Sequence, residues 1–334
     1  MRHEGSRRRI GRARLPGAGP HPGRGGVRFA HLLVPLDGSR LAEAALPAAL
    51  ALARWFGAQV TLLHVLERTA PTHVHGEPHL RARDEALAYL TAHARWLAAE
   101  GVAAQVHVDA AGAHAGPSGA DIAASIAAEA AAHGADLIVL CTHGSGGLRG
   151  LLFGRVAQQV LARGRVPVLL VRPHAAGRAR PFRCRRVLVP LDGSETAEGA
   201  LAPAAALARA AGASLLLMWV VPTAATVSGD RGPAARLMPT AAAALLEDEA
   251  AQARAYLDGL VATLRGDGLD ARAQVERGDP VAALMAAAAR EEIDLIVMTT
   301  HGRSGLAAVW AGSVASRLVA QSPLPVLLVR TPSS

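Results

Sequence analysis

The sequence predicts an α/β fold made of two doubly wound, open, parallel five-stranded sheets that follow one another along the chain. Three observations predict this fold class. The chain has 334 residues, which suits about two domains of ordinary size. Three motifs recur in the same order about one domain apart. Between these motifs, short apolar segments alternate with segments of helical periodicity, a pattern typical of parallel sheets covered by helices.

The recurring motifs indicate a duplication. The first reads LLVPLDGS and then VLVPLDGS, the second reads DLIVLCTHG and then DLIVMTTHG, and the third reads PVLLVR both times. They begin at Leu32, Asp136 and Pro167, and again at Val187, Asp294 and Pro325. The offsets of 155, 158 and 158 residues are too long for a solenoid repeat and fit two whole domains. We therefore expect a first domain over 29–173 (the first half) and a second over 183–331 (the second half), with a short linker between them.

The elements of the first half follow in order from its periodicity. We expect strands at 31–35, 59–66, 102–108, 137–141 and 167–171, separated by helices at 41–56, 80–100, 120–133 and from about 154. Gly134 is a typical signal for the end of the third helix. The segments 137–140 and 293–298 are continuous apolar runs, as expected for strands buried on both faces of a parallel sheet. The second half repeats the same order.

The net charge of +8 comes almost entirely from residues 1–28, which hold eight Arg against the single acidic residue Glu4. Because this Arg/Gly/Pro-rich segment can bury little apolar surface, we expect a disordered leader, or a translation start assigned too early. A basic tail can bind nucleic acid or an anionic surface. The rest of the chain is nearly neutral, however, so we expect neither a nucleic-acid partner nor a membrane partner.

Location is predicted from what the sequence lacks. The N-terminal segment contains no apolar core of a signal peptide. The longest run without charge, 210–229, is interrupted by Pro222, so we interpret its apolar part, 215–221, as a buried strand. Cys141 and Cys184 form no disulfide framework. These features predict a cytoplasmic protein.

The segments after the strands carry the chemistry. In doubly wound sheets, ligands bind beyond the carboxyl ends of the strands, where the strand order reverses. In the second half, Gly302 follows such a strand, and after nine intervening residues Gly312 and Ser313 precede a helix. Glycines let the backbone approach an anion, and a helix N-terminus adds N–H donors and partial positive charge. This loop is therefore predicted to hold a polyphosphate.

The PLDGS turn after the first strand and the G-x2-G-x9-G-[S/T] loop after the fourth resemble the ATP-binding members of the universal stress protein family. The resemblance covers nearly all of 30–331, in both halves, and implies the adenine nucleotide alpha hydrolase-like fold. It implies that the Asp of the turn and the backbone at the end of the second strand hold the nucleoside, while the glycine loop holds the phosphates. The implied cofactor is ATP, or ADP or AMP, with Mg²⁺ held through the phosphates. The implied binding residues are Pro190, Asp192, Val220, His301, Gly302, Arg303, Gly312, Ser313 and Val314, and in the first half Pro35, Asp37, Val65, His143, Gly144, Gly154 and Val156.

Three positions depart from the family pattern. Cys141 and Thr299 stand where the first glycine of the loop is expected, and Arg155 replaces the Ser or Thr of the first half. Losing that hydroxyl removes a hydrogen bond worth about 1.5–3 kcal/mol to a charged acceptor, although an arginine could pair with a phosphate directly. We therefore expect the second half to contain the better-preserved site and the first half a degenerate or altered one.

The expected function is that of an adenine-nucleotide-binding regulator in a stress response. The chain contains no Lys, and hence no P-loop lysine, and no Ser/His/Asp triad is evident, so we expect no catalytic turnover beyond slow hydrolysis of bound ATP. The two halves should pair with each other, an additional homodimer is left open, and the protein partner is unknown. The alternative is a nucleotide-free protein-interaction module of the same fold, which Thr299, Cys141 and Arg155 favour. An adenylating enzyme would need an SGGxDS-like loop in place of PLDGS.

Several candidate residues have a second interpretation. Asp37 and Asp192 could cap the helices that follow them. His143 and His301 could pack within their loops, Arg303 could face solvent, and the four Trp residues are interpreted as core or interface. Because neither a Cys nor a second spaced pair accompanies His73, His75 and His79, no metal site is predicted.

Overall fold

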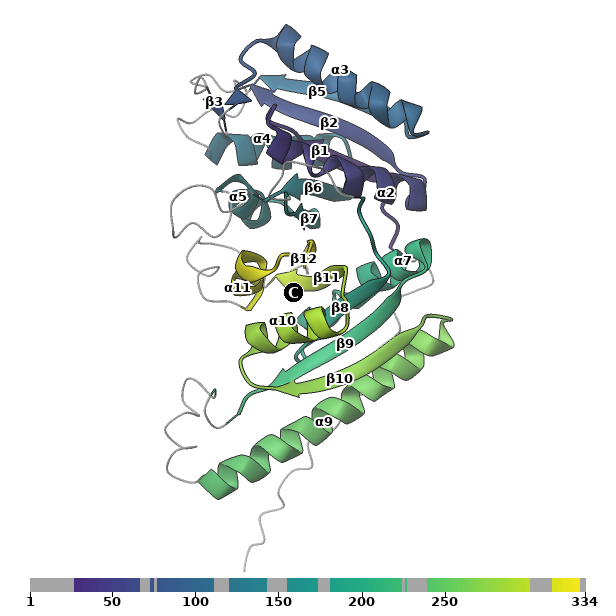
Figure 1. The fold of residues 1–334 in the computed structure, drawn as a ribbon, viewed down its shortest axis with the longest axis vertical. Helices are drawn as coiled ribbons and strands as arrows, with labels where there is room; N and C mark the ends of the chain where they lie inside the picture. Colours follow the sequence, from purple (N-terminus) through teal and green to yellow (C-terminus); the bar gives the residue numbers. More distant parts are fainter. Residues whose placement is uncertain are drawn as a thin grey trace, which may run out of the picture.

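The computed structural model describes residues 27–66, 73–74, 77–110, 120–142, 155–173, 181–223, 226, 239–300 and 314–330. Ten strands form one sheet, in the order β10-β9-β8-β11-β12-β7-β6-β1-β2-β5 (Figure 1). The first half contributes β1 (His31–Pro35), β2 (Gln59–Leu66), β5 (Ala104–Ala110), β6 (Leu137–Cys141) and β7 (Val168–Val171). The second half contributes β8 (Arg186–Leu191), β9 (Ser214–Val221), β10 (Ala271–Arg277), β11 (Leu295–Thr300) and β12 (Val326–Arg330). Within each half the five strands are parallel, and the first strand lies between the second and the fourth. The predicted doubly wound fold is confirmed.

The two halves do not form separate sheets. Strand β7 pairs with β12 in antiparallel fashion, with Val168 opposite Leu328 and Leu170 opposite Val326. An apolar edge strand exposes unpaired N–H and C=O groups, and pairing the fifth strand of each half removes one such edge from both. The outer strands of the joined sheet are β5 and β10, which lie at opposite ends of the molecule beside α3 (Arg83–Ala99) and α9 (Pro239–Gly266) (Figure 1).

Two arginines from the repeated PVLLVR motif cross this junction reciprocally. Arg172 donates hydrogen bonds to the backbone oxygens of Val319, at 2.7 Å, and Ala320, in the last turn of α11 (Val314–Gln321). Arg330 donates to the backbone oxygens of Ala162 and Gly164, at the end of α5 (Arg155–Arg163). The last carbonyls of a helix lack intrahelical partners and carry partial negative charge. Each half therefore caps a helix of the other.

Helices cover both faces of the sheet. One face packs against α1 (Arg40–Glu43), α2 (Leu46–Phe56), α3, α6 (Glu195–Glu198), α7 (Leu201–Ala211) and α9, and the other against α4 (Ala120–Ala132), α5, α10 (Pro280–Arg290) and α11. Each face has an apolar core that contains residues of both halves. Within the described residues, no helix is both long and apolar enough to span a membrane.

The expected helix over 41–56 is wrong in one respect, because it is divided into α1 and α2. Pro47 lies in the first turn of α2, where it has no N–H to donate and would clash with the carbonyl of Glu43 in a continuous helix. Helix α1 ends at Glu43 for this reason. The second half repeats the break between α6 and α7, with Pro203 in the first turn of α7.

Other boundaries differ by a few residues. The third strand, expected at 102–108, is Ala104–Ala110, and the helix expected at 80–100 is Arg83–Ala99. The segment after β2, expected as a loop, contains a short antiparallel pair, β3 (His73–Val74) and β4 (Glu77–Pro78). Glu77 anchors this pair to the turn after β1, because its carboxylate accepts a hydrogen bond from the backbone N–H of Arg40 at 2.6 Å.

Candidate functional site

The candidate site in each half lies at the carboxyl ends of its first and fourth strands. Strand β1 pairs with β2 on one side and β6 on the other, and β8 pairs likewise with β9 and β11. After β1 the chain forms β2 on one side of it, and only later returns to form β6 on the other side. The strand order thus reverses here, which is the position where open α/β sheets bind ligands.

The turn after the first strand holds its aspartate through a serine. Oδ1 of Asp192 accepts hydrogen bonds from the backbone N–H of Ser194 at 3.1 Å and from its hydroxyl at 2.6 Å. The Ser194 hydroxyl oxygen in turn accepts from the backbone N–H of Ala197 at 3.1 Å and caps α6. The helix cap is therefore the serine and not the aspartate. Asp192 is an exposed residue, and within the described part of the chain no group hydrogen-bonds to its second carboxylate oxygen.

The first half repeats the contacts between the aspartate and the serine. Asp37 accepts hydrogen bonds from the backbone N–H of Ser39 at 2.9 Å and from its hydroxyl at 2.7 Å, and Ser39 caps α1. Burial raises the pKa of Cys141, at the end of β6, to about 12, and the negative charge of Asp37 contributes to this shift. The Cys141 thiol, which donates a hydrogen bond to the backbone oxygen of Thr142 at 3.4 Å, is thus protonated at neutral pH. A thiol that stays protonated is a poor nucleophile and a poor metal ligand.

A tyrosine and a glutamate stand beside each turn, and sequence reasoning missed both. Tyr256 of α9 donates a hydrogen bond to Glu198 of α6 at 2.6 Å, and Tyr89 of α3 donates to Glu43 of α1 at 3.2 Å. Burial raises the pKa of both tyrosines, and the negative charges of the neighbouring glutamate and turn aspartate raise it further. The available signal was the recurrence of Glu43 and Glu198 at the same offset of 155 residues as the PLDGS motif.

A large apolar side chain covers the turn glycine in each half. Gly193 has a φ of +77°, and a Cβ atom added there would lie 2.3 Å from the Trp219 ring. Gly38 has a φ of +90°, and its Cβ would lie 2.8 Å from Cγ of Leu80. Trp219 is half-buried and packs edge-on against Tyr256, with ring centroids 5.6 Å apart. Trp219 therefore packs within the fold, as expected, and its ring lies against the turn of the candidate site.

The position matching Trp219 in the first half is His64, at the same offset of 155 residues. His64 is buried, with Nδ1 2.8 Å from the backbone oxygen of Leu36 and Nε2 3.4 Å from that of Leu80. These contacts join the turn after β1 to the segment after β4. The two halves therefore differ in what lies beside the turn: an indole in the second and a buried imidazole with Leu80 in the first.

The other expected binding residues are placed as follows. Pro35 lies opposite Leu63 in the neighbouring strand, two residues before Val65. Pro190 lies opposite Met218, two residues before Val220. Each proline and its valine are therefore at the same edge of the sheet. Val156 and Val314 lie in the first turns of α5 and α11. The expected phosphate loops fall outside the described residues, and with them His143, Gly144, Gly154, His301, Gly302, Arg303, Gly312 and Ser313.

The histidines near β3 were not predicted to bind metal. Of these, His75 lies outside the described residues, and His79 is buried, with its ring centroid 6.1 Å from that of His64. The group of described residues with metal-ligand spacing is elsewhere, at His107, Glu129 and His133. Sequence reasoning missed it because His107 belongs to a different element from the other two.

Both halves of the chain are similar in sequence to known proteins. The sequence model of the Universal stress protein family matches residues 28–172 and again 183–330. The universal stress protein in the QAH/OAS sulfhydrylase 3' region of Thermus aquaticus is 34% identical over 148 residues, which cover 44% of this chain and 98% of that protein. Universal stress protein Sll1388 of Synechocystis is 29% identical over 149 residues, covering 43% and 97%.

A similar arrangement of the whole chain is found in a solved structure. The crystal structure of a universal stress protein from Archaeoglobus fulgidus DSM 4304 superimposes with a TM-score of 0.63 and covers 91% of this chain and 97% of that one, at 19% identity. At that identity the likeness concerns the fold. The two matches to the family model show that this chain belongs to the universal stress protein family and contains two of its domains in tandem.

Proposed function

We propose that this protein binds an adenine nucleotide, ATP foremost, at the strand ends of the second half, and that it acts as a regulator in a stress response. The observation that carries the proposal is the geometry of Asp192. Asp192 is an exposed residue at the switch point; one of its carboxylate oxygens is fixed by Ser194, and the other has no hydrogen-bond partner among the described residues. Acidic side chains near such switch points accept hydrogen bonds from ribose hydroxyls.

The rest of the proposed site follows from the family resemblance. The backbone at Val220 would contact the base, and the loop with Gly302, Gly312 and Ser313 would hold the phosphates against the N-terminus of α11. Mg²⁺ would be held through the phosphates. Binding would stabilise one arrangement of the two halves and report nucleotide status to a protein partner in the cytoplasm. The chain would do so without catalytic turnover beyond slow hydrolysis.

The test compares matched variants of the two turns by calorimetry with Mg²⁺ and ATP. Asp192→Asn keeps an acceptor for Ser194 but removes the charge, and a charged hydrogen bond of about 1.5–3 kcal/mol corresponds to a loss of about tenfold or more in affinity. Asp37→Asn makes the same change in the first half, and we expect it to weaken binding less. If the wild-type chain neither binds ATP at millimolar concentration nor co-purifies with a nucleotide, the proposal is wrong.

A second candidate function is a nucleotide-free interaction module of the same fold. The large side chains that lie over the turn glycines favour it. Trp219 and Leu80 pack directly against Gly193 and Gly38, in the space beside the aspartates. In this case the turns would serve only to build the fold. Trp219→Ala separates the candidates, because opening this space should preserve or strengthen ATP binding at a nucleotide site, whereas a nucleotide-free module should bind no ATP in either form.

A further inference from the structure

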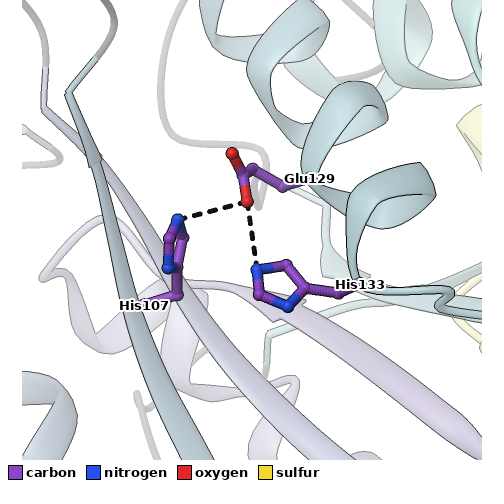
Figure 2. A group of neighbouring side chains, drawn as sticks. All are labelled: His107, Glu129 and His133. Carbon is purple, nitrogen blue, oxygen red and sulfur yellow. Dashed lines mark ion pairs between the residues drawn. The ribbon is translucent and has the colours of Figure 1, made fainter.

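Three side chains with metal-ligand chemistry meet in the first half (Figure 2). His107 extends from β5, while Glu129 lies in α4 and His133 directly follows it. Nε2 of His107 and Nε2 of His133 each lie 3.1 Å from the same oxygen, Oε2 of Glu129. One ligand atom from each residue lies within 4.8 Å of the others. We propose that this group binds a divalent transition-metal ion, with Zn²⁺ as the preferred ion.

The spacing fits a single small ion. Zinc binds imidazole nitrogen and carboxylate oxygen at about 2.0–2.1 Å, so two ligand atoms of a tetrahedral ion are about 3.3 Å apart. The two nitrogen–oxygen separations of 3.1 Å are close to this value. Two imidazoles and one carboxylate form a ligand set that zinc uses when it keeps a fourth position for water. Imidazole ligands also favour transition metals over Mg²⁺ or Ca²⁺.

The elements that carry the ligands hold them in place. The backbone N–H of His133 donates to the backbone oxygen of Glu129 at 2.9 Å, which continues the helical turn past the end of α4. The two side chains, four residues apart, therefore lie on the same side of this turn. His107 lies in the middle of β5, opposite Leu63 of β2, so its position is fixed by the sheet. The Glu129 side chain is 16% exposed, whereas His107 and His133 are 36% and 29% exposed. An ion can thus approach past the imidazoles and reach a carboxylate that is largely withdrawn from water.

The imidazole rings of the proposed metal ligands pack against each other and against a third histidine ring. The rings of His107 and His133 meet edge-on with centroids 4.9 Å apart. The ring of His31 stands edge-on to His133 at 6.4 Å, and its Nε2 lies 2.8 Å from the hydroxyl of Thr61. These contacts limit the rotation of the imidazoles, which lowers the entropy lost when a metal orders them.

The second half shows that the fold does not require this group. By strand register and motif offset, Gln274, Ala287 and Glu291 occupy the positions of His107, Glu129 and His133. There, Glu291 pairs with Arg272 at 2.7 Å and with Arg290 at 3.1 Å. An ordinary ion-pair network thus holds the corresponding surface in a duplicate of the same fold. The His–Glu–His group is a particular property of the first half.

The test uses the full chain, freed of metal with a chelator and titrated with Zn²⁺ by calorimetry. The variants are His107→Gln, which introduces the residue that the second half has at this position, and His133→Gln. Replacing residues that merely support a metal ligand usually costs 10–100-fold in affinity, so removing a ligand should weaken Zn²⁺ binding at least about tenfold. With Co²⁺ as a second probe, the wild-type protein should show the visible absorption of a tetrahedral site, and the variants should lose it.

His93→Gln is the matched control. His93 is half-buried and lies 3.3 Å from Glu43, but no third metal ligand accompanies this pair among the residues that the structure describes. This variant should bind Zn²⁺ as the wild type does. The proposal is overturned if the wild-type chain binds no Zn²⁺, in which case the group is only a metal-free charge cluster, or if Zn²⁺ affinity is unchanged in both His107→Gln and His133→Gln, which would place the ion elsewhere. Circular dichroism of each variant establishes that it is folded.

Discussion

At the scale of single residues, the turn glycine of the second half has the least freedom to change. Gly193 needs a positive φ, and its missing Cβ makes room for the Trp219 ring. The PLDGS motif indicates the first requirement, because a tight turn after a strand favours glycine. The second depends on Trp219, which lies 26 residues further along the chain, and no local pattern contains it.

We expect Gly193→Ala to destabilise the protein by about 1–3 kcal/mol, since it combines backbone strain with overpacking against the indole. The measurement is the free energy of unfolding in a denaturant titration. Gly212→Ala is the control, because Gly212 also has a positive φ, +67°, but a Cβ there meets nothing within 4 Å. Equal losses in the two variants would show that the contact with Trp219 contributes nothing.

At the scale of elements, the repeated DLIV motif ties the fourth strand to the first. The carboxylate of Asp136, just before β6, accepts hydrogen bonds from the backbone N–H groups of Ala30, at 2.7 Å, and His31, at 3.2 Å. Asp294 makes the same contacts with Arg185 and Arg186, at 2.8 and 3.2 Å. The motif thus fixes the neighbours between which the strand order reverses. Its recurrence was visible in the sequence, but its partners were not.

Replacing Asp136 with Ala should lower the free energy of unfolding by about 1.5–3 kcal/mol, because two backbone N–H groups lose a charged acceptor. Thermal or chemical unfolding measures the loss. Asp267→Ala is a suitable comparison, since Asp267 makes an exposed ion pair with Arg209 at 3.6 Å, and such pairs contribute little. A loss for Asp136→Ala no larger than that of Asp267→Ala would contradict the structural role.

The elements themselves were predicted to different degrees. Strands β1, β2 and β6 have the predicted bounds, because each is a short apolar run with clear turn residues at its ends. The helix over 41–56 was expected to be continuous because its apolar residues keep helical spacing through Pro47, and periodicity does not record the missing N–H. The β3–β4 pair could not be predicted, since strands of two residues have no periodicity.

At the scale of the whole molecule, the junction depends on the arginines that end the PVLLVR motifs. Arg172 and Arg330 each reach the C-terminal carbonyls of a helix in the other half. Burial lowers the pKa of Arg172, as expected for a guanidinium partly withdrawn from water at this junction. These reciprocal arginine contacts are nearly symmetric, so the two halves are paired as two copies of a domain would be in a dimer.

The double variant Arg172→Ala/Arg330→Ala should loosen the junction. Each change leaves helix-terminal carbonyls without a charged donor, at a cost of about 1–3 kcal/mol. Hydrogen exchange should accelerate in β7 and β12 more than in β2 and β9, the second strands of the two halves. Arg54→Ala is the control, because Arg54 also donates to a backbone oxygen, that of Glu100 at 2.6 Å, but within one half. Unchanged exchange in β7 and β12 would count against the arginines as determinants of the junction.

The sequence by itself determined that there are two α/β halves, that their strands are doubly wound, and that a PLDGS turn ends the first strand of each. These properties are local, because periodicity and turn residues within about ten positions encode them. Only the tertiary structure decided that β7 and β12 join the halves into one sheet, that Trp219 covers Gly193, and that His107 meets Glu129 and His133. Each of these features depends on contacts between residues that are distant in the chain. The packing of the helices and strands brings such residues together, and no local sequence pattern encodes it.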